Sequence, residues 1–433
     1  MKKVLALVLA LLMMSAMFLA ACKPTDADTD DSGSQGSSSQ DSSSEPKPGE
    51  GYMVAMVTDY GDITDQSFNQ STYEACKAFC EEYKLGFKYF KPVGNTTADR
   101  VSMIEAAIDE GYNVIVMPGY AFAGAIVEAA PNYKDVKFVA LDVGLGDLLE
   151  AGVTAKGQKY DYDPPSNWKL EDYVDMSNVY SAIYQEELPG YMAGYAAVKL
   201  GYTKLGFLGG MAVPAVIRYG SGFVQGADAA AKELGITIDM NYVYGGLFQG
   251  DPAITAVMDT WYQNGTQVVF ACGGGIYTSA ADAAKKVGGK LIGVDVDQQG
   301  IIDEGYGAGT TVTSAMKGLY PATYDTLTDI IINGNWEKYA GKIETLGLVG
   351  EDVEKNYVQL PYESTQWAEG KFTQDDYKAL VKKMFDGTPP LCRQSPTPNS
   401  ATRAESSAKH SALHASPAPN RHGEWLPEVE WAQ

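Results

Sequence analysis

Histidine is almost absent from this sequence, and basic residues are too few to balance the acidic ones. The three histidines, His410, His414 and His422, all lie near the C-terminus, so the body of the chain has no imidazole for base catalysis or metal binding. The chain has 433 residues, with 33 Lys and Arg against 55 Asp and Glu, a formal net charge of −22. This negative charge would repel a phosphate backbone, so nucleic acid is not a predicted partner.

Several motifs of known chemistry are missing as well. No G-x-G-x-x-G follows the first predicted strand and no G-x-x-x-x-G-K-[ST] occurs, which argues against a nucleotide cofactor. The G-x-S-x-G elbow of many hydrolases is also lacking. Asp295-x-Asp297-x-Gln299-Gly300 resembles half of a calcium loop, but Tyr306 stands where a bidentate Glu would be needed. We therefore predict neither a cofactor nor a metal ion.

Cysteine is also scarce, and its spacing does not suggest a disulfide framework. Cys76 and Cys80 are four residues apart on a predicted helix, whereas Cys272 and Cys392 are far away in the sequence. Buried free thiols are the simpler interpretation of these four residues.

The N-terminus has the pattern of an export signal. Two lysines precede an apolar run from Val4 to Ala21, and the small residues Ala20-Ala21 stand directly before Cys22. This arrangement resembles the bacterial lipobox, which implies removal of residues 1–21 and acylation of the Cys22 thiol. Two or three acyl chains would hold the protein on the extracytoplasmic face of the cell membrane. An uncleaved membrane anchor is the alternative, but the run is short for a membrane span.

The two ends of the mature chain have compositions that do not support folding. Residues 22–50 are dominated by Asp, Ser, Gly, Gln and Pro, which predicts a disordered tether. Residues 388–433 are rich in Pro, Ser, Ala, Arg and His, and we predict a disordered and dispensable tail. Truncation after Gly387 tests this prediction, because lost solubility or ligand binding would contradict it.

Between these ends, short apolar runs alternate with amphipathic stretches, which is typical of parallel sheets built from βαβ units. The predicted strands are 53–58, 87–91, 114–117, 136–141, 178–183, 204–208, 238–243, 267–271, 290–294 and 311–313. The clearest predicted helices are 67–83, 98–110, 213–234, 251–264 and 372–385. Glycine pairs such as Gly209-Gly210 and Gly273-Gly274 follow strands, where they could form tight turns or approach a ligand closely.

Four blocks in fixed order carry a resemblance to a known family. The segment Thr58–Gln70, TDYGDITDQSFNQ, resembles the opening signature of the basic membrane protein family of lipoproteins, whose best understood members are purine nucleoside receptors. The remaining blocks are 116–119 with 138–142, 206–223, and 292–298 with 313–317. The resemblance covers roughly residues 52–387. Many relatives carry a Gly-Gly-Thr-Gly turn where this chain has Gly273-Gly274-Gly275-Ile276-Tyr277, so an aromatic residue is expected near the cleft.

The resemblance implies a type I periplasmic-binding-protein fold, with two doubly wound α/β lobes joined by three crossovers and a ligand between them. We expect the N-terminal lobe to comprise residues 51–178 plus about 297–330. The C-terminal lobe would comprise residues 179–296 plus about 331–387. The stretch 155–175 resembles an insertion.

Carboxylates at strand ends are the main candidates for a binding site. Asp59, Asp142 and Asp295 each stand at the carboxyl end of a predicted strand, where doubly wound sheets bind their ligands. A carboxylate can accept two hydroxyl hydrogen bonds, which suits the vicinal diol of a ribose. Each aspartate could instead be a helix cap or lie in a solvated turn.

Residue-by-residue match to the nucleoside-receptor pattern implies the remaining roles. Phe68 and Phe248 would stack on the two faces of a base, although their spacing alone favours ordinary core positions. Asn69 and Asp142 would contact the base edge. The ribose would be read by Asp59, Asp295 and Lys317, a lysine whose usual fate would be exposure. Gly274 completes the candidate ligand-binding set.

The sequence therefore predicts a lipid-anchored, monomeric substrate-binding protein without enzymatic activity. It would capture a nucleoside, with a purine base the expected kind, and deliver it to an ABC transporter permease. A secreted nucleoside or sugar hydrolase is the main alternative, since paired carboxylates can cleave glycosidic bonds. A signalling lipoprotein that binds another small ligand is the third reading.

Overall fold

The computed structural model describes residues 48–161 and 168–387, which belong to the unit Lys47–Gln433. The predicted leader, the acylation site at Cys22, nearly all of the tether, Cys392 and the tail 388–433 lie outside the described residues. The same holds for residues 162–167 within the expected insertion.

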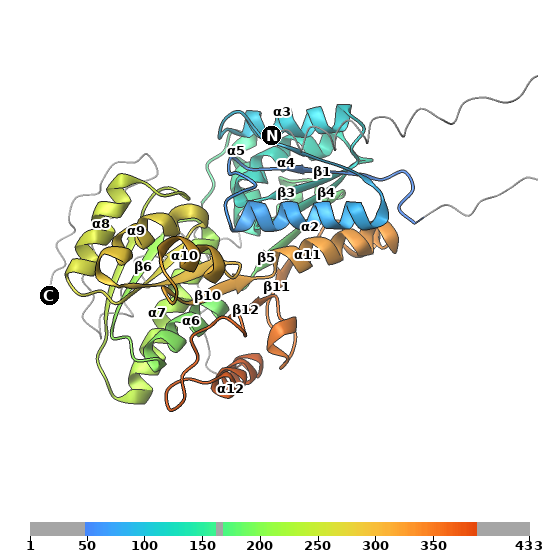
Figure 1. The fold of residues 1–433 in the computed structure, drawn as a ribbon. Helices are drawn as coiled ribbons and strands as arrows, with labels where there is room; N and C mark the ends of the chain where they lie inside the picture. The colour runs from blue at the N-terminus through green and yellow to red at the C-terminus, as the bar shows by residue number, and fades with distance from the viewer. Residues whose placement is uncertain (1–47, 162–167, 388–433) are drawn as a thin grey trace, which may run out of the picture. The chain divides into compact units, whose positions relative to one another are not determined.

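The first lobe is built on a six-stranded parallel sheet with the order β11-β5-β4-β3-β1-β2. Its strands are β1 (Met53–Val57), β2 (Gly86–Phe90), β3 (Val114–Pro118), β4 (Lys137–Leu141), β5 (Val179–Tyr184) and β11 (Ile343–Leu346). One face is covered by α2 (Phe68–Tyr83) and α11 (Leu319–Leu327), which lie side by side (Figure 1). The other face is covered by α3 (Thr97–Asp109), α4 (Ala123–Ala129) and α5 (Leu145–Ala155).

The second lobe repeats this architecture with the order β12-β10-β9-β8-β6-β7. Its strands are β6 (Lys204–Gly209), β7 (Asp239–Tyr244), β8 (Val268–Cys272), β9 (Lys290–Asp295), β10 (Thr311–Lys317) and β12 (Val358–Gln359), the last antiparallel to β10. One face carries α6 (Glu187–Lys199) and α7 (Pro214–Leu234), and α12 (Gln374–Phe385) packs against α6. The other face carries α8 (Pro252–Gln263), α9 (Tyr277–Val287) and α10 (Gln299–Tyr306).

The remaining helical elements of the described chain are short. They are η1 (Tyr120–Phe122), η2 (Ala130–Asn132), η4 (Leu170–Asp172), η5 (Gly274–Ile276), the π-helical turn η6 (Thr328–Ile332), η7 (Trp336–Lys338) and η8 (Val353–Lys355).

Apolar strands buried on both faces explain why each lobe forms three layers. Along β1, Val54 and Met56 belong to the core under α2, whereas Ala55 and Val57 belong to the core under α3 and α4. All four side chains are fully buried, as the period-two geometry of a strand requires when helices cover both faces. The continuous apolar runs in the sequence therefore correspond to central parallel strands.

Helix starts follow the expected local chemistry. Proline opens α7 at Pro214, and the Asp251 carboxylate caps α8 by accepting a hydrogen bond of 2.7 Å from the Ala253 N–H. The described cysteines Cys76, Cys80 and Cys272 are buried free thiols, as predicted.

Within residues 48–161 and 168–387 the chain passes between the two sheets three times, after β5, after β10 and after β11. The expected lobe boundaries were wrong at three strands, since β11 belongs to the first sheet although about 331–387 was assigned to the second lobe. β5 belongs to the first sheet, although residues from 179 onward were assigned to the second lobe, and β10 belongs to the second sheet instead of the first. The short edge strands β11 and β12 were not predicted, because β11 is a partly exposed four-residue strand and β12 has only two residues.

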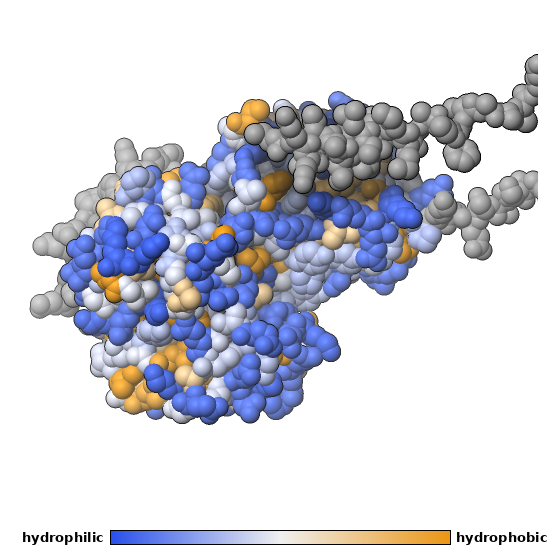
Figure 2. Space-filling view, in the orientation of Figure 1, coloured by the Kyte–Doolittle hydropathy of each residue, from blue (hydrophilic) through white to orange (hydrophobic). Residues whose placement is uncertain are grey.

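The visible surface of the protein is mainly hydrophilic, with separate hydrophobic spots (Figure 2). Exposed apolar side chains are scattered along the chain, for example Val93, Leu145, Leu234 and Val349. Among the described residues, no helix is both long enough and apolar enough to cross a membrane.

Candidate functional site

Charged side chains from both sheets meet at the carboxyl ends of their strands. Asp59 and Asp142 follow β1 and β4 of the first sheet, whereas Asp295 and Lys317 are the last residues of β9 and β10 of the second. Each of these side chains is buried, with at most 9% exposure. Asp142 and Asp295 have positive φ angles of 60° and 65°, a left-handed conformation that Asp tolerates better than most residues. The predicted positions at strand ends are confirmed.

The ammonium group of Lys317 is the centre of this cluster. Its Nζ contacts the Asp142 carboxylate and lies 3.6 Å from Asp295 Oδ1. A third carboxylate, Glu186, places Oε1 at 3.4 Å from the same nitrogen. Lys317 is only 4% exposed, which rules out the alternative of an ordinary surface lysine.

Aromatic rings surround the same ammonium group. The Nζ atom of Lys317 lies 4.5 Å from the centroid of the Phe68 ring, 5.5 Å from that of Tyr184 and 5.8 Å from that of Tyr219. The negative faces of aromatic rings attract a cation at these distances. Phe68 is half-buried, and its position beside Lys317 brings an aromatic face into the polar cluster.

Contacts around this cluster join the two lobes. The Ser67 hydroxyl of the first lobe donates to Asp295 Oδ2 of the second at 2.6 Å. Gln298 Nε2 of the second lobe donates to the Gln66 carbonyl oxygen of the first at 3.1 Å. Together with the pair between Lys317 and Asp142, these bonds hold the lobes in contact at the strand ends.

The electrostatics of the cluster follow from one shared cation and several buried anions. Burial alone would lower the pKa of Lys317, but Asp142, Asp295 and Glu186 reverse this effect and raise it. Burial raises the pKa of Asp142 to about 7, because Lys317 only partly offsets the cost of desolvation and Glu186 adds repulsion. One ammonium group divided among three carboxylates cannot fully compensate each of them. Asp142 Oδ1 has no hydrogen-bond partner among the described residues.

Asp59 and Asn69 form a second group, entirely within the first lobe. Asp59 Oδ1 accepts hydrogen bonds from the N–H groups of Tyr60 at 2.6 Å and Gly61 at 2.8 Å. Asn69 Nδ2 donates to Asp65 Oδ2 at 3.1 Å, whereas the buried Asn69 Oδ1 has no partner among the described residues. Burial raises the pKa of Asp59 even though these N–H groups oppose the shift. The group therefore offers an unused buried acceptor beside a carboxylate.

Phe248 and Gly274 form a third group in the second lobe. A Cβ atom on Gly210 would stand 2.3 Å from the half-buried Phe248 ring, and one on Gly273 would stand 3.0 Å from it. The glycines after β6 and β8 thus make room for this ring, which sequence reasoning could not distinguish from ordinary tight turns. Gly274 has a φ angle of 54°, and its carbonyl accepts a 3.5 Å hydrogen bond from Gln298 Nε2. Tyr277, expected near the cleft, is instead buried in the core under α8 and α9.

Two charged residues of the cluster were missed by sequence reasoning. Glu186 is fully buried just after β5, and the Arg218 Nε atom of α7 donates to its Oε2 at 2.5 Å. Two sequence signals could have identified them. Glu186 stands three residues after the predicted strand 178–183, and Arg218 is the only charged residue between Lys204 and Asp228.

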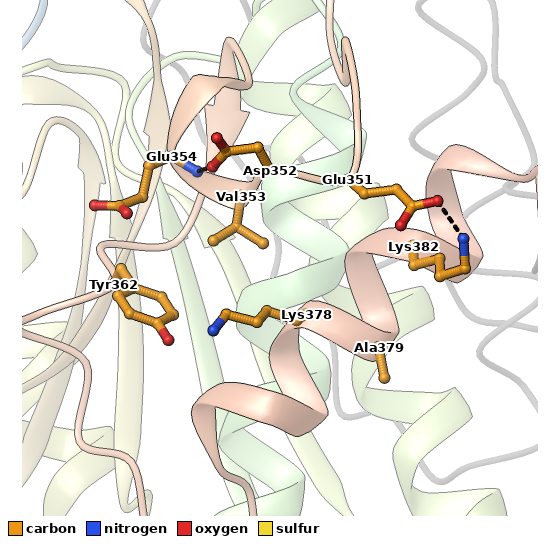
Figure 3. A pocket seen from close by; sticks show the side chains of 8 residues that line it. All are labelled: Glu351, Asp352, Val353, Glu354, Tyr362, Lys378, Ala379 and Lys382. Atoms are coloured by element: carbon orange, nitrogen blue, oxygen red, sulfur yellow. Dashed lines mark hydrogen bonds and ion pairs between the residues drawn. The ribbon is translucent and has the colours of Figure 1, made fainter.

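A surface pocket elsewhere in the second lobe has no part in this cluster. It lies between η8 and α12 (Figure 3) and is lined by Glu351, Asp352, Val353, Glu354, Tyr362, Lys378, Ala379 and Lys382. Lys382 pairs with Glu351, Lys378 with Asp375 and Asp352 with Lys355. In the described ranges, no group of His, Cys, Asp and Glu could hold a metal ion.

Two α/β lobes joined by three crossovers, with strand ends meeting at a polar cluster, have the architecture of the type I periplasmic-binding-protein fold. A crystal structure of an ABC transporter solute-binding protein from Aeropyrum pernix shares this fold with a TM-score of 0.57. It is 19% identical in sequence, and the match covers 82% of this chain and 90% of that one.

The family follows from the sequence itself. The family model for ABC transporter substrate-binding proteins of the PnrA-like type, Bmp, matches residues 52–371. The chain belongs to this family of substrate-binding proteins, as its four sequence blocks indicated.

Two relatives illustrate the family. The ABC transporter nucleoside-binding protein BmpA of Lactococcus lactis is 28% identical over 314 residues, which is 69% of this chain and 75% of the relative. An uncharacterized lipoprotein of Pyrococcus abyssi is 24% identical over 307 residues, 68% of this chain and 66% of the relative.

Proposed function

We propose that this substrate-binding protein captures a nucleoside, with a purine base, between its two lobes. It then delivers the nucleoside to the permease of an ABC-type importer. The protein acts as a monomer on the extracytoplasmic face of the membrane, held by acyl chains on Cys22. It binds its ligand without changing it chemically.

The observation that carries this proposal is the combination of half-buried aromatic rings in both lobes and unused buried acceptors near the strand ends. Phe68 and Phe248 are half-buried aromatic residues, one in each lobe. Asn69 Oδ1 and Asp142 Oδ1 are buried acceptors without partners among the described residues. A flat base with N–H donors at its edge suits both features, because rings stack on its faces and acceptors bind its edge.

The polar group that remains fits a sugar. Asp295 and Asp59 supply carboxylate oxygens that can accept hydrogen bonds from ribose hydroxyls, and Lys317 can donate to a hydroxyl or ring oxygen. The nucleoside-binding relative from Lactococcus lactis supports this ligand class. The lipoprotein relative and the Cys22 sequence support the anchor.

Closure of the lobes would be the recognition event. The bonds from Ser67 to Asp295 and from Gln298 to Gln66 join the lobes at the cluster itself. A ligand that contacts both sheets would favour the arrangement in which these bonds form. A permease could then distinguish the loaded protein from the free one by its lobe arrangement.

A thermal-shift panel of nucleosides, free bases and sugars tests the ligand class. A ligand at 100 times its dissociation constant stabilises the native state by about 2.7 kcal/mol, so a purine nucleoside should raise the midpoint of unfolding clearly. Ribose and free bases should raise it less, because each meets only part of the site. A panel in which only sugars stabilise the protein would contradict the proposal.

Recovery of the bound ligand separates binding from hydrolysis. The protein is incubated with labelled purine nucleoside, the complex is isolated, and the ligand is released by denaturation. Intact nucleoside is the expected result. Released base would support the alternative of a nucleoside hydrolase using paired carboxylates.

A further inference from the structure

Glu186 is a buried carboxylate with a cation on each side. Its side chain has no exposed surface, Oε2 accepts from Arg218 Nε at 2.5 Å, and Oε1 lies 3.4 Å from Lys317 Nζ. Burial opposes ionisation of Glu186, but Arg218 and Lys317 more than offset burial, and the pKa of Glu186 lies below its ordinary value. Glu186 is therefore ionised at neutral pH, and its charge acts on Lys317.

Glu186 and Lys317 also stand on the segments that connect the lobes. Glu186 lies between β5 and α6, where the chain first crosses to the second sheet, and Lys317 is the last residue before the second crossing. The third crossing binds to both segments, because Gln185 N–H donates to the Leu346 carbonyl at 2.9 Å and Gly318 N–H donates to the Tyr357 carbonyl at 2.7 Å. The three connecting segments together form the hinge between the lobes. The ion pair between Glu186 and Lys317 thus joins the first of these segments to the second.

We infer that Glu186, braced by Arg218, is a positioning residue that fixes the Lys317 ammonium between the lobes and so sets the charge state of Asp142. This inference rests on the proposed function, in which Asp142 and Lys317 meet the ligand. Glu186 need not touch the ligand to affect its binding.

The charges of the cluster explain why such a residue matters. Two cations, Lys317 and Arg218, face three carboxylates, Asp142, Asp295 and Glu186. The hydroxyl groups of Tyr184 and Tyr219 are further titratable groups that interact with Asp142. Because Glu186 repels the Asp142 carboxylate and Arg218 attracts it, the two residues shift proton binding at Asp142 in opposite directions.

Without the Glu186 charge, the balance of the cluster would change in two ways. The Lys317 ammonium would interact only with Asp142 and Asp295, and it would lose its link to the first hinge segment. Asp142 would release its proton at a lower pH. A residue that merely filled space would produce neither effect.

The test compares Glu186→Gln, Arg218→Gln and the matched control Glu344→Gln. Glu344 lies on β11 beside the hinge and accepts a hydrogen bond of 2.7 Å from the Tyr180 hydroxyl. The full chain is labelled with ¹³C at aspartate carboxyl carbons, and the Asp142 signal is assigned with Asp142→Asn. Its titration midpoint in the free protein is the main readout, so no ligand is required.

We expect Glu186→Gln to lower the Asp142 midpoint by about one pH unit or more and Arg218→Gln to raise it, while Glu344→Gln leaves it unchanged. Glu186→Asp should restore the midpoint because it keeps the charge. Unchanged midpoints in both cluster variants, or shifts in the same direction, would overturn the inference. If either Glu186→Gln or Arg218→Gln does not fold, the direction in which the other variant shifts the Asp142 midpoint still tests the inference.

Ligand binding gives the second readout. At pH 8, Glu186→Gln should bind guanosine or inosine about tenfold more weakly than the wild type, whereas Glu344→Gln should bind normally. Wild-type affinity of Glu186→Gln at pH 8 would show that Lys317 is positioned without Glu186. If the wild type binds no nucleoside while the midpoints shift as expected, the proposed ligand class fails but the role of Glu186 toward Lys317 and Asp142 stands.

Discussion

The two lobes repeat one architecture, but at one pair of equivalent strand ends they carry opposite charges. Both sheets have the same strand order, so β4 corresponds to β9 and β5 to β10. At the ends of β4 and β9 the lobes agree, since Asp142 and Asp295 both have a left-handed backbone and both contact Lys317. After β5, however, the first lobe carries Glu186, whereas the second lobe ends β10 with Lys317.

This difference makes the lobes complementary. The first lobe contributes Asp142 and Glu186 to the cluster, and the second contributes Asp295, Lys317 and Arg218. A symmetric pair of lobes would place like charges together at the hinge, which is unfavourable in a buried site. The exchange of one carboxylate for a lysine at equivalent strand ends allows two similar domains to meet at a polar centre.

Removal of the shared cation should give the largest effect. Lys317→Met leaves three buried carboxylates without their common partner, and breaking a buried ion pair in this way costs about 3 to 5 kcal/mol. We expect a loss of that size in the free energy of unfolding, measured by urea denaturation at pH 8.

The matched control is Lys286→Met. Lys286 also pairs with a carboxylate, Asp259, at 2.7 Å, but its side chain is half-exposed. An exposed pair contributes about 1 kcal/mol or less. Similar losses in the two variants would mean that the lysine of the second lobe does not bind the lobes together.

The aromatic residues allow a direct comparison of the two lobes. We expect Phe68→Ala and Phe248→Ala each to weaken nucleoside binding roughly tenfold or more, because a stacking contact contributes about 1 to 3 kcal/mol. Isothermal titration calorimetry measures the affinity, and urea denaturation measures the stability of each variant.

Phe79→Ala is the control in the same helix as Phe68. Phe79 is fully buried in the core, so its loss should cost about 3 to 5 kcal/mol of stability. If Phe68→Ala behaves like Phe79→Ala and keeps its affinity, Phe68 belongs to the core. A loss of affinity in only one of the two site variants would show that the ligand stacks on one lobe alone.

The pH dependence of stability reports the carboxylate of the first lobe. Burial raises the pKa of Asp142 from 3.8 to about 7, so between these values the folded protein keeps a proton that the unfolded chain has released. Stability should therefore fall as the pH rises from 5 to 7, by up to about 1 kcal/mol per pH unit from this residue. Burial also raises the pKa of Asp147 to about 6, which adds to the same slope.

Asp142→Asn should reduce this slope without removing it, because Asp147 still contributes. The measurement is the free energy of unfolding at pH 5, 6 and 7 for the wild type and the variant. An unchanged slope would show that Asp142 is ionised over the whole range and that Lys317 fully compensates its burial.

The sequence predicts most of this fold because the central strands are long apolar runs with clear helix starts between them. It also places Asp59, Asp142 and Asp295 at strand ends, since a βα turn follows each run directly. The lobe boundaries are harder to predict, because β5 and β10 look like any other buried strand and only pairing assigns them to a sheet.

The partners within the site could not be predicted either. Lys317 and Glu186 are 131 residues apart in sequence, and a lysine is usually exposed. The burial of Lys317 follows only from the contact between lobes, which no local pattern encodes. Phe68 likewise has the spacing of a core residue, although its ring faces an ammonium group.

The smallest predicted effect concerns the hydrogen bond between Ser67 and Asp295. This bond of 2.6 Å joins the two lobes, so it stabilises only the arrangement in which they touch. Asp295 keeps Tyr219 at 3.4 Å and Lys317 at 3.6 Å when the serine hydroxyl is lost, which limits the cost of Ser67→Ala to about 1 kcal/mol. Because this cost falls on the closed arrangement alone, nucleoside affinity should drop a few-fold while the free energy of unfolding of the ligand-free protein changes little.

Thr72→Val is the control for Ser67→Ala, since the Thr72 hydroxyl donates a hydrogen bond within α2 to the Phe68 carbonyl at 3.0 Å. Calorimetric titration measures the nucleoside affinity of both variants. Equal affinities of Ser67→Ala and Thr72→Val would show that the Ser67 bond does not contribute to closure.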